Sequence, residues 1–250
     1  MYEYSLLALA AFFAGVLNTV AGGGTFLTFP ALVYVGVPPV AANATSAVAV
    51  FPGYLGGALG FIRELKAVDR RLLLKFVGMT LLGGLGGSLL LLVSSNEAFS
   101  IVVPFLLLLA TGAFAFGDRV QDWSRSAKFA LRPNGGVAMT LVSIYGGYFN
   151  GGLGIVLLAL FSLWGMRDLN QMNGLKNGLS FVLSAISVTT FAAAGIVAWP
   201  QALVMMAAAI AGGYAGAPLA RALPKAVVRG GVILIGLVMS GVFFFRLLLA

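Results

Sequence analysis

The sequence contains no cysteine and no histidine, and only seven of its 250 residues are acidic. Without cysteine there are no disulfides, no thiolate metal ligands and no cysteine nucleophile. Histidine is the commonest general base and the commonest metal ligand, so neither role has its usual residue here. All seven acids fall in expected loops or at expected helix ends. The sequence therefore predicts that the protein is not an enzyme, with no catalytic residue, no metal and no cofactor.

Charged residues are also scarce. They make up 9% of the chain, whereas 60% is hydrophobic and the mean hydropathy is +1.04. About a quarter of a typical soluble domain is charged, so this composition predicts an all-α polytopic integral membrane protein. The net charge of +8 fits basic residues gathered in cytoplasmic loops better than it fits nucleic-acid binding. We therefore expect the lipid bilayer as a partner and no nucleic acid. The first residues lack the positive flank of a signal peptide, and we expect no cleavage.

The apolar runs follow the order short, short, long, long, long, and this order occurs twice. Each short run has about 13 residues and reaches roughly 20 Å as a helix. The hydrocarbon core is about 30 Å thick, so a short run alone does not cross it. We expect each pair of short runs to form a hairpin that meets at a glycine-rich tip, although ten full crossings remain an alternative. The runs are 6–19, 25–37, 44–62, 72–93 and 98–117, then 137–149, 153–166, 178–198, 202–219 and 230–249.

Residue matches at a shift of about 130 support a duplication: 83–87 (GGLGG) aligns with 212–216 (GGYAG), and 112–116 with 241–245. Lysine and arginine gather in 63–75, 119–132 and 221–229, which should be cytoplasmic, and Arg246 is the one charge against this orientation. Counting crossings from these loops makes the halves inverted and puts both termini outside. We predict two inverted-topology repeats, 1–117 and 134–250, joined by a cytoplasmic linker, 118–133. Each repeat is a glycine-broken short-helix hairpin plus three transmembrane helices.

Inverted repeats with broken helices are typical of secondary transporters, which bind substrate between the repeats. The first tip, residues 18–25, and the second tip, residues 150–154, carry neutral polar side chains and glycines. Amide, hydroxyl and backbone N–H donors at the start of a half-helix suit an anion. The structural alternatives are that the asparagines cap the breaks and that the glycines only permit close packing. The candidate substrate-binding residues are Asn18, Gly22, Gly23, Gly24, Thr25, Asn43, Thr45, Ser46, Asn150, Gly151, Gly152, Asn173, Lys176 and Asn177.

Lys176 is the one candidate that carries a charge. It lies about seven residues past Asp168-Leu169, hence roughly 10 Å into the next long helix. Either its side chain snorkels to the inner interface, or it attracts an anion beside the second tip. No acid is available inside the membrane, which argues against coupling to cations.

Several motifs resemble the signature of the TauE/SafE sulfite exporter family: 18–24 (NTVAGGG), 30–32 (PAL), Gly36 and 42–46 (ANATS). The resemblance extends over essentially the whole chain, including its size, its repeat and its basic central linker. It implies export of sulfite, sulfonates or related organosulfur anions. The second half departs from the pattern, because no proline matches Pro30 and Lys176-Asn177 stands where a Thr-Ser pair is typical.

These expectations combine into a transporter that exports sulfite or a small organosulfonate across a bacterial inner membrane. Two alternatives stay open at this point. One is uptake, or a channel-like permease for another small anion. The other is a membrane scaffold or assembly subunit whose polar tips are purely structural. The glycine-rich faces of 72–93 and 202–219 also leave a homodimer open.

Overall fold

A computed structural model of the chain describes residues 2–20, 23–126, 136–222 and 225–249, and these residues form helices and no strand. This confirms the all-helical prediction. The helices are α1 (Tyr2–Val20), α2 (Thr25–Tyr34), α3 (Pro39–Gly60), α4 (Ile62–Lys66), α5 (Arg70–Val93), α6 (Asn96–Ser126), α7 (Gly136–Tyr148), α8 (Leu153–Leu163), α9 (Leu169–Ala193), α10 (Trp199–Ala222) and α11 (Lys225–Leu249).

Three of the four runs predicted to form short helices do so, and the first run does not. Helices α2, α7 and α8 have 10, 13 and 11 residues. The prediction for the first run is wrong, because α1 has 19 residues and begins at Tyr2. Its first turn includes Glu3 and exposed tyrosines. A boundary predicted from apolar residues marks where the helix leaves the hydrocarbon layer. The helix itself continues beyond that point.

The same effect extends α6 into the predicted linker. Its 31 residues reach roughly 47 Å, which is longer than the about 30 Å hydrocarbon core. Residues 118–126 of the expected linker thus continue α6, and Arg119 lies 5.8 Å from the Phe116 ring centroid. The rest of the linker up to residue 133 lies outside the described residues. Helix α4, within the first basic segment, was not predicted.

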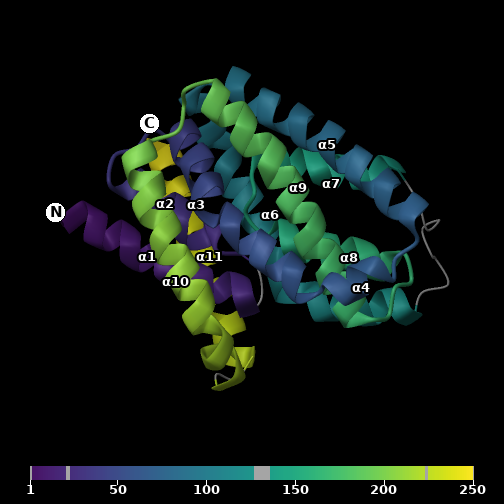
Figure 1. The fold of residues 1–250 in the computed structure, drawn as a ribbon. Helices are drawn as coiled ribbons and strands as arrows, with labels where there is room; N and C mark the ends of the chain where they lie inside the picture. Colours follow the sequence, from purple (N-terminus) through teal and green to yellow (C-terminus); the bar gives the residue numbers. More distant parts are fainter. Residues whose placement is uncertain (1, 21–22, 127–135, 223–224, 250) are drawn as a thin grey trace.

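Helices of the first half pack mainly against helices of the second half, an arrangement we call crosswise packing. Helix α1 packs against α10, and its counterpart α7 packs against α5 (Figure 1). Helix α3 packs against α9 and α6 against α11, so each of these helices packs against its predicted counterpart in the other half. The contact of α5 with α9 likewise corresponds to the contact of α10 with α3, because α10 is the predicted counterpart of α5 and α3 that of α9. Both hairpins therefore lie within a scaffold made by both halves.

Glycines permit the closest of these packings. A Cβ at Gly87 of α5 would lie 2.1 Å from the Ile144 carbonyl oxygen of α7. A Cβ at Gly212 of α10 would lie 1.9 Å from the Phe12 carbonyl oxygen of α1. The helix backbones themselves are in contact at both places, as small residues allow in membranes. This confirms a packing role for the Gly83–Gly87 and Gly212 motifs.

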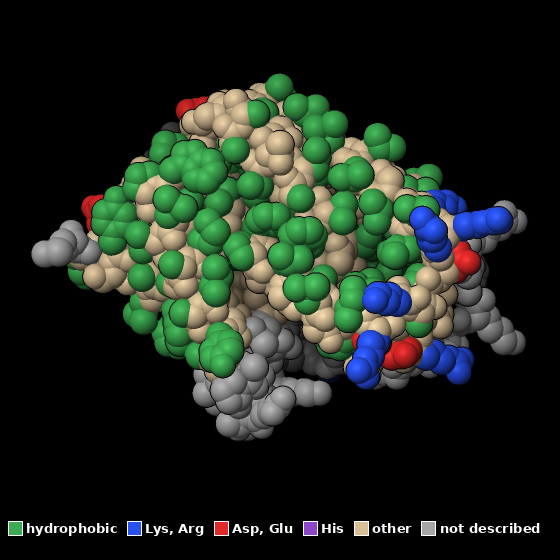
Figure 2. All heavy atoms as spheres, viewed as in Figure 1, with side chains coloured by type: hydrophobic (Ala, Val, Ile, Leu, Met, Phe, Trp, Pro, Cys, Tyr) green, Lys and Arg blue, Asp and Glu red, His purple; other side chains and the backbone are tan. Residues whose placement is uncertain are grey.

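The surface fits a lipid environment. Hydrophobic side chains cover most of the face seen in Figure 2, while lysine and arginine gather toward one end. Large apolar residues such as Leu82 and Val93 are 73% and 80% exposed. Within the described residues, two helical stretches are long and apolar enough by themselves to cross a membrane, Arg70–Val93 and Asn170–Ala193.

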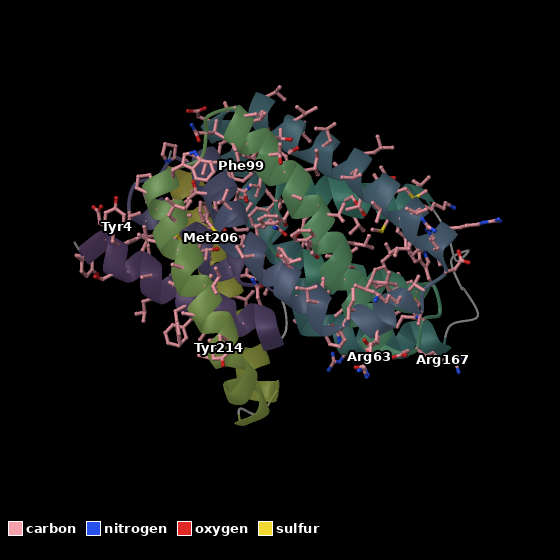
Figure 3. The ribbon with its side chains drawn as sticks, in the orientation of Figure 1. Tyr4, Arg63, Phe99, Arg167, Met206 and Tyr214 are labelled. Carbon is pink, nitrogen blue, oxygen red and sulfur yellow. The ribbon has the colours of Figure 1, made fainter. Side chains whose placement is uncertain are left out.

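Basic side chains and chain termini lie apart. Arg63 and Arg167, from different halves, lie at the same end of the molecule, away from Tyr4 (Figure 3). Both termini lie on the opposite side of the view (Figure 1). The side chains of Arg221, Lys225, Arg229 and Arg246 lie outside the described residues, as do those of Arg125, Lys128 and Arg132.

Candidate functional site

The first tip is built around the Asn18 side chain. Its Oδ1 accepts hydrogen bonds from the Gly23 and Gly24 backbone N–H groups, at 3.1 and 2.8 Å. Gly23 has φ +117°, a conformation that favours glycine, and a Cβ at Gly24 would lie 2.7 Å from the Ala14 carbonyl oxygen. Asn18 therefore bonds the backbone of the break itself, although α2 has no side-chain N-cap, and the two glycines allow the tight turn.

The polar residues near the first tip are largely bonded to one another or to backbone. Thr28 Oγ1 and Ser46 Oγ lie 2.6 Å apart, and Asn43 Nδ2 donates to the Tyr148 carbonyl oxygen at 2.8 Å. Thr45 Oγ1 accepts from the Ala198 backbone N–H at 3.0 Å, which ties α3 to the segment before α10. Asn43 Oδ1 is buried without a partner. These hydrogen bonds hold helices of both halves together.

The second tip is organised differently. Gly152 has φ +73° and precedes the first residue of α8. Asn150 does not cap this helix: its Oδ1 accepts from the Tyr54 hydroxyl and its Nδ2 donates to Ser184 Oγ, each at 3.3 Å. The Tyr145 hydroxyl donates to the Gly151 carbonyl oxygen. Side chains from α3, α7 and α9 therefore hold the second tip.

The N–H groups at the start of α8 are available. Those of Gly151, Gly152 and Gly154 make no hydrogen bond with any residue that the structure describes. The first N–H groups of a helix have no intrahelical acceptor, and their end of the helix dipole is positive. The two tips also approach each other, since a Cβ at Gly152 would lie 3.7 Å from the Phe26 ring of α2.

Lys176 lies against this second tip. A Cβ at Gly154 would lie 3.2 Å from Lys176 Cδ and 3.8 Å from its Cε. The lysine is 8% exposed, and no acceptor or carboxylate among the described residues pairs with its ammonium. None of the acids whose side chains the structure describes is buried. An unpaired charge that is largely removed from water is unfavourable, so an anion beside this ammonium would be stabilising.

The other predicted residues are placed as follows. Thr25 is buried at the first residue of α2, and Asn173 is half-buried on α9. Asn177 packs beneath α3, where a Cβ at Gly57 would lie 2.7 Å from its Cγ. Gly22 lies outside the described residues.

The list of candidate binding residues left out Tyr54, Tyr145, Ser184 and Gly154, although Gly154 lies within the predicted second tip. For two of these the sequence held a signal. Tyr54 and Ser184 occupy equivalent positions at the repeat offset of about 130, and both bond to Asn150. Tyr145 had no such signal, because its contact depends on how the second tip folds back.

The fold and these contacts define a class: a helical membrane protein with two broken-helix tips and, beside the second, a nearly buried lysine without a partner among the described residues. The family model described as "Sulfite exporter TauE/SafE" matches residues 7–243. The chain belongs to this family, and it is an integral membrane protein of a transporter family. The suggested family is thereby confirmed.

Named relatives agree with this class. A "Probable membrane transporter protein" of Haemophilus influenzae is 28% identical over 94% of this chain and 92% of its own length. "Probable membrane transporter protein YfcA" of Escherichia coli is 25% identical over 94% of this chain and 87% of its own. "Probable membrane transporter protein ORF9" of a Sinorhizobium species is 24% identical over 94% and 90%. These names fit a protein that is not an enzyme. No solved structure matches the chain.

Proposed function

We propose that the protein exports a small oxyanion, sulfite or an organosulfonate, across the bacterial inner membrane and binds it at the second tip. The observation that carries this proposal is Lys176, a residue only 8% exposed whose ammonium has no partner among the described residues. The name of the family supports the substrate class. The bound anion would supply the counterion that the chain itself does not place there.

The second tip offers more than charge. Its glycine N–H groups and the start of α8 lie beside Lys176, so an anion there gains hydrogen bonds and a favourable helix dipole. Asn150 is held from two helices, which fixes the geometry of the loop. The burial of Lys176 favours this role over snorkelling, which would leave the side chain along the molecular surface.

The arrangement of the halves supports a transport mechanism. We take the two halves as inverted repeats, each with a hairpin and three crossings. The crosswise packing of α1 with α10 and α7 with α5 supports this relation. The Phe51 and Phe181 rings, related by the repeat offset, stack 5.0 Å apart at 8° where α3 meets α9. Rocking of one repeat against the other would open the site to each side in turn.

The decisive test is flux of the purified protein in liposomes, measured with sulfite, sulfate, sulfoacetate, taurine and chloride. We expect saturable flux of sulfite or a sulfonate and little of chloride. Lys176→Met should fold and insert, yet lose at least tenfold in anion affinity, because removing one member of a buried charge pair costs about 2–5 kcal/mol. Lys176→Arg should restore affinity only in part, since a planar guanidinium directs its donors differently.

A matched control is Lys66→Met, which removes the same charge from an exposed position on α4. Its affinity should be unchanged. Equal affinity in wild type and Lys176→Met would reject the proposed site. Flux in liposomes of known orientation, with the gradient imposed in either direction, separates export from uptake. Absence of flux for all five anions would favour the scaffold alternative.

A further inference from the structure

One face of α9 is polar along most of its length. Asn173, Lys176, Ser180, Ser184 and Ser187 recur every three or four residues, so they lie along one side of the helix. The last four are buried, with exposed fractions of 8%, 0%, 0% and 2%. We call these four residues the α9 polar face. Buried polar side chains in a membrane helix mark a polar cavity, a partner or a substrate route.

The α9 polar face is directed at the second tip. Lys176 lies against Gly154, and Ser184 Oγ accepts a hydrogen bond from Asn150 Nδ2 at 3.3 Å. Ser180 lies between Lys176 and Ser184 on the same face, one turn from each. Ser180 is therefore on the same side of α9 as the two residues that contact the second tip.

Two hydroxyls of this face make no hydrogen bond with any described residue. Ser180 Oγ and Ser187 Oγ are both buried without such a partner. Two other buried helix hydroxyls bond to the carbonyl four residues earlier, Ser143 with Met139 at 2.8 Å and Ser240 with Gly236 at 2.7 Å. That local bond is the usual solution for serine within a helix. Ser180 and Ser187 do not use it, so their hydroxyls are left to donate elsewhere.

Other unpartnered hydroxyls do not form such a group. Thr80, Thr111 and Ser162 each occur singly, on three different helices. Among the helices as far as the structure describes them, only α9 combines two such hydroxyls with a nearly buried lysine on one face.

The equivalent face of α3 lacks these features. At the repeat offset of about 130, Lys176 corresponds to Ser46, whose hydroxyl is paired with Thr28 at 2.6 Å. Ser180 corresponds to Val50 and Ser187 to Gly57. Among the described residues, the α9 polar face thus presents a charge and unpaired donors, and the equivalent face of α3 does not. A substrate route that requires donors thus follows α9.

We infer that Ser180 is part of the anion-binding site and that Ser187 lines the continuation of the anion's route along α9. This inference rests on the proposed function and deepens it. In the binding step, the Lys176 ammonium supplies the charge and the Ser180 hydroxyl donates one hydrogen bond to an anion oxygen. Ser187, two turns further along the same face, donates to the anion after it leaves Lys176.

The absence of native cysteine makes a direct test available. Single Ser180→Cys and Ser187→Cys variants are reconstituted and treated with the anionic sulfonatoethyl methanethiosulfonate and with neutral methyl methanethiosulfonate. The cysteine thiolate attacks the sulfenyl sulfur, forms a disulfide and releases methanesulfinate. Because only a wetted thiol ionises and reacts readily, labelling reports a water-filled route. Ser143→Cys is the matched control, since Ser143 is equally buried but bonded to its own helix.

We expect both α9 cysteines to react at least tenfold faster than the Ser143→Cys control. In the Ser180→Cys protein, adding Lys176→Met should slow the anionic reagent at least tenfold relative to the neutral one. Cysteines at 180 and 187 that react as slowly as the control would overturn the inference.

A second measurement covers the case in which cysteine perturbs folding. Ser180→Ala should weaken sulfite affinity by about tenfold, the usual loss of one hydrogen bond to a charged group, while Ser143→Ala leaves it unchanged. If Lys176→Met reduces affinity but neither serine assay responds, this inference fails and the proposed function stands. If the wild-type protein carries none of the five anions, both fail together.

Discussion

At the scale of single residues, the two tips use similar side chains for different purposes. Asn18 accepts hydrogen bonds from its own tip and makes the break between α1 and α2. Asn150 instead bridges Tyr54 of α3 and Ser184 of α9. The first tip is therefore mainly internally bonded, whereas the second leaves backbone donors and an ammonium free. This difference concentrates the candidate binding groups on one side of the molecule.

Asn18→Ala should destabilise the first tip, because two backbone N–H groups lose their acceptor. Leaving a buried backbone donor without its acceptor costs about 1–3 kcal/mol, and we expect a lower melting temperature in detergent. Asn18→Asp keeps an acceptor oxygen and should retain more of the melting temperature than the alanine variant does. Equal melting temperatures in wild type and Asn18→Ala would show that these hydrogen bonds do not matter.

Gly154→Ala should weaken anion binding without unfolding the protein. Its new Cβ would lie 3.2 Å from Lys176 Cδ, tight enough to displace the lysine stem from the start of α8. Alanine itself suits a helix better than glycine by about 0.5–1 kcal/mol, so stability should not fall greatly. Anion affinity and melting temperature are measured together. Gly56→Ala on α3, where a Cβ meets no atom within 4 Å, is the control, and equal affinities in the two variants would exclude the contact.

At the scale of helices, contact between backbones decides which glycines are replaceable. Gly86 and Gly87 are neighbours on α5, yet a Cβ at Gly86 would lie 4.0 Å from the nearest Ile144 atom and one at Gly87 only 2.1 Å from the Ile144 carbonyl oxygen. The same glycine-rich motif thus contains one position in direct helix contact and one that is open.

We therefore expect Gly87→Ala to separate α5 from α7 and to lower both the yield of folded protein and its melting temperature. Gly86→Ala should be neutral or slightly stabilising, by up to about 1 kcal/mol, because alanine favours helix. Size-exclusion profiles and melting curves of the two variants provide the comparison. A Gly86→Ala variant that is as unstable as Gly87→Ala would contradict the packing geometry.

At the scale of the whole molecule, the crosswise pairing of helices makes each half depend on the other. Helix α1 finds its main neighbour in α10, and α7 finds its own in α5. Basic residues of different halves, Arg63 and Arg167, lie at one end, away from the termini (Figures 1 and 3). This arrangement agrees with the cytoplasmic placement predicted for the basic loops.

The topology prediction follows from this arrangement. Reporter fusions after Arg70 and after Arg125 should map to the cytoplasm, and a fusion at the carboxyl terminus should map to the outside. Alkaline phosphatase and green fluorescent protein report the two sides in opposite ways, so each site has an internal control. A cytoplasmic carboxyl terminus would break the inverted-repeat relation.

The sequence by itself determined the class of the protein and the places where its helices break. The apolar composition shows that the chain folds in a lipid bilayer. Glycine runs such as Gly22–Gly24 interrupt the helix locally, so their effect can be predicted from the sequence. Helix ends were less predictable: α1 and α6 continue beyond their apolar runs, because a helix does not end where hydrocarbon does.

Only the tertiary structure decided which polar residues are satisfied. Asn18 and Asn150 look alike in sequence, but the partners of Asn150 lie 96 and 34 residues away on other helices. The contact of Lys176 with Gly154 and the unpaired hydroxyls of Ser180 and Ser187 likewise depend on how α8 and α9 pack. Hydrogen bonding and burial are properties of neighbours in space, and for these residues the neighbours come from distant parts of the chain.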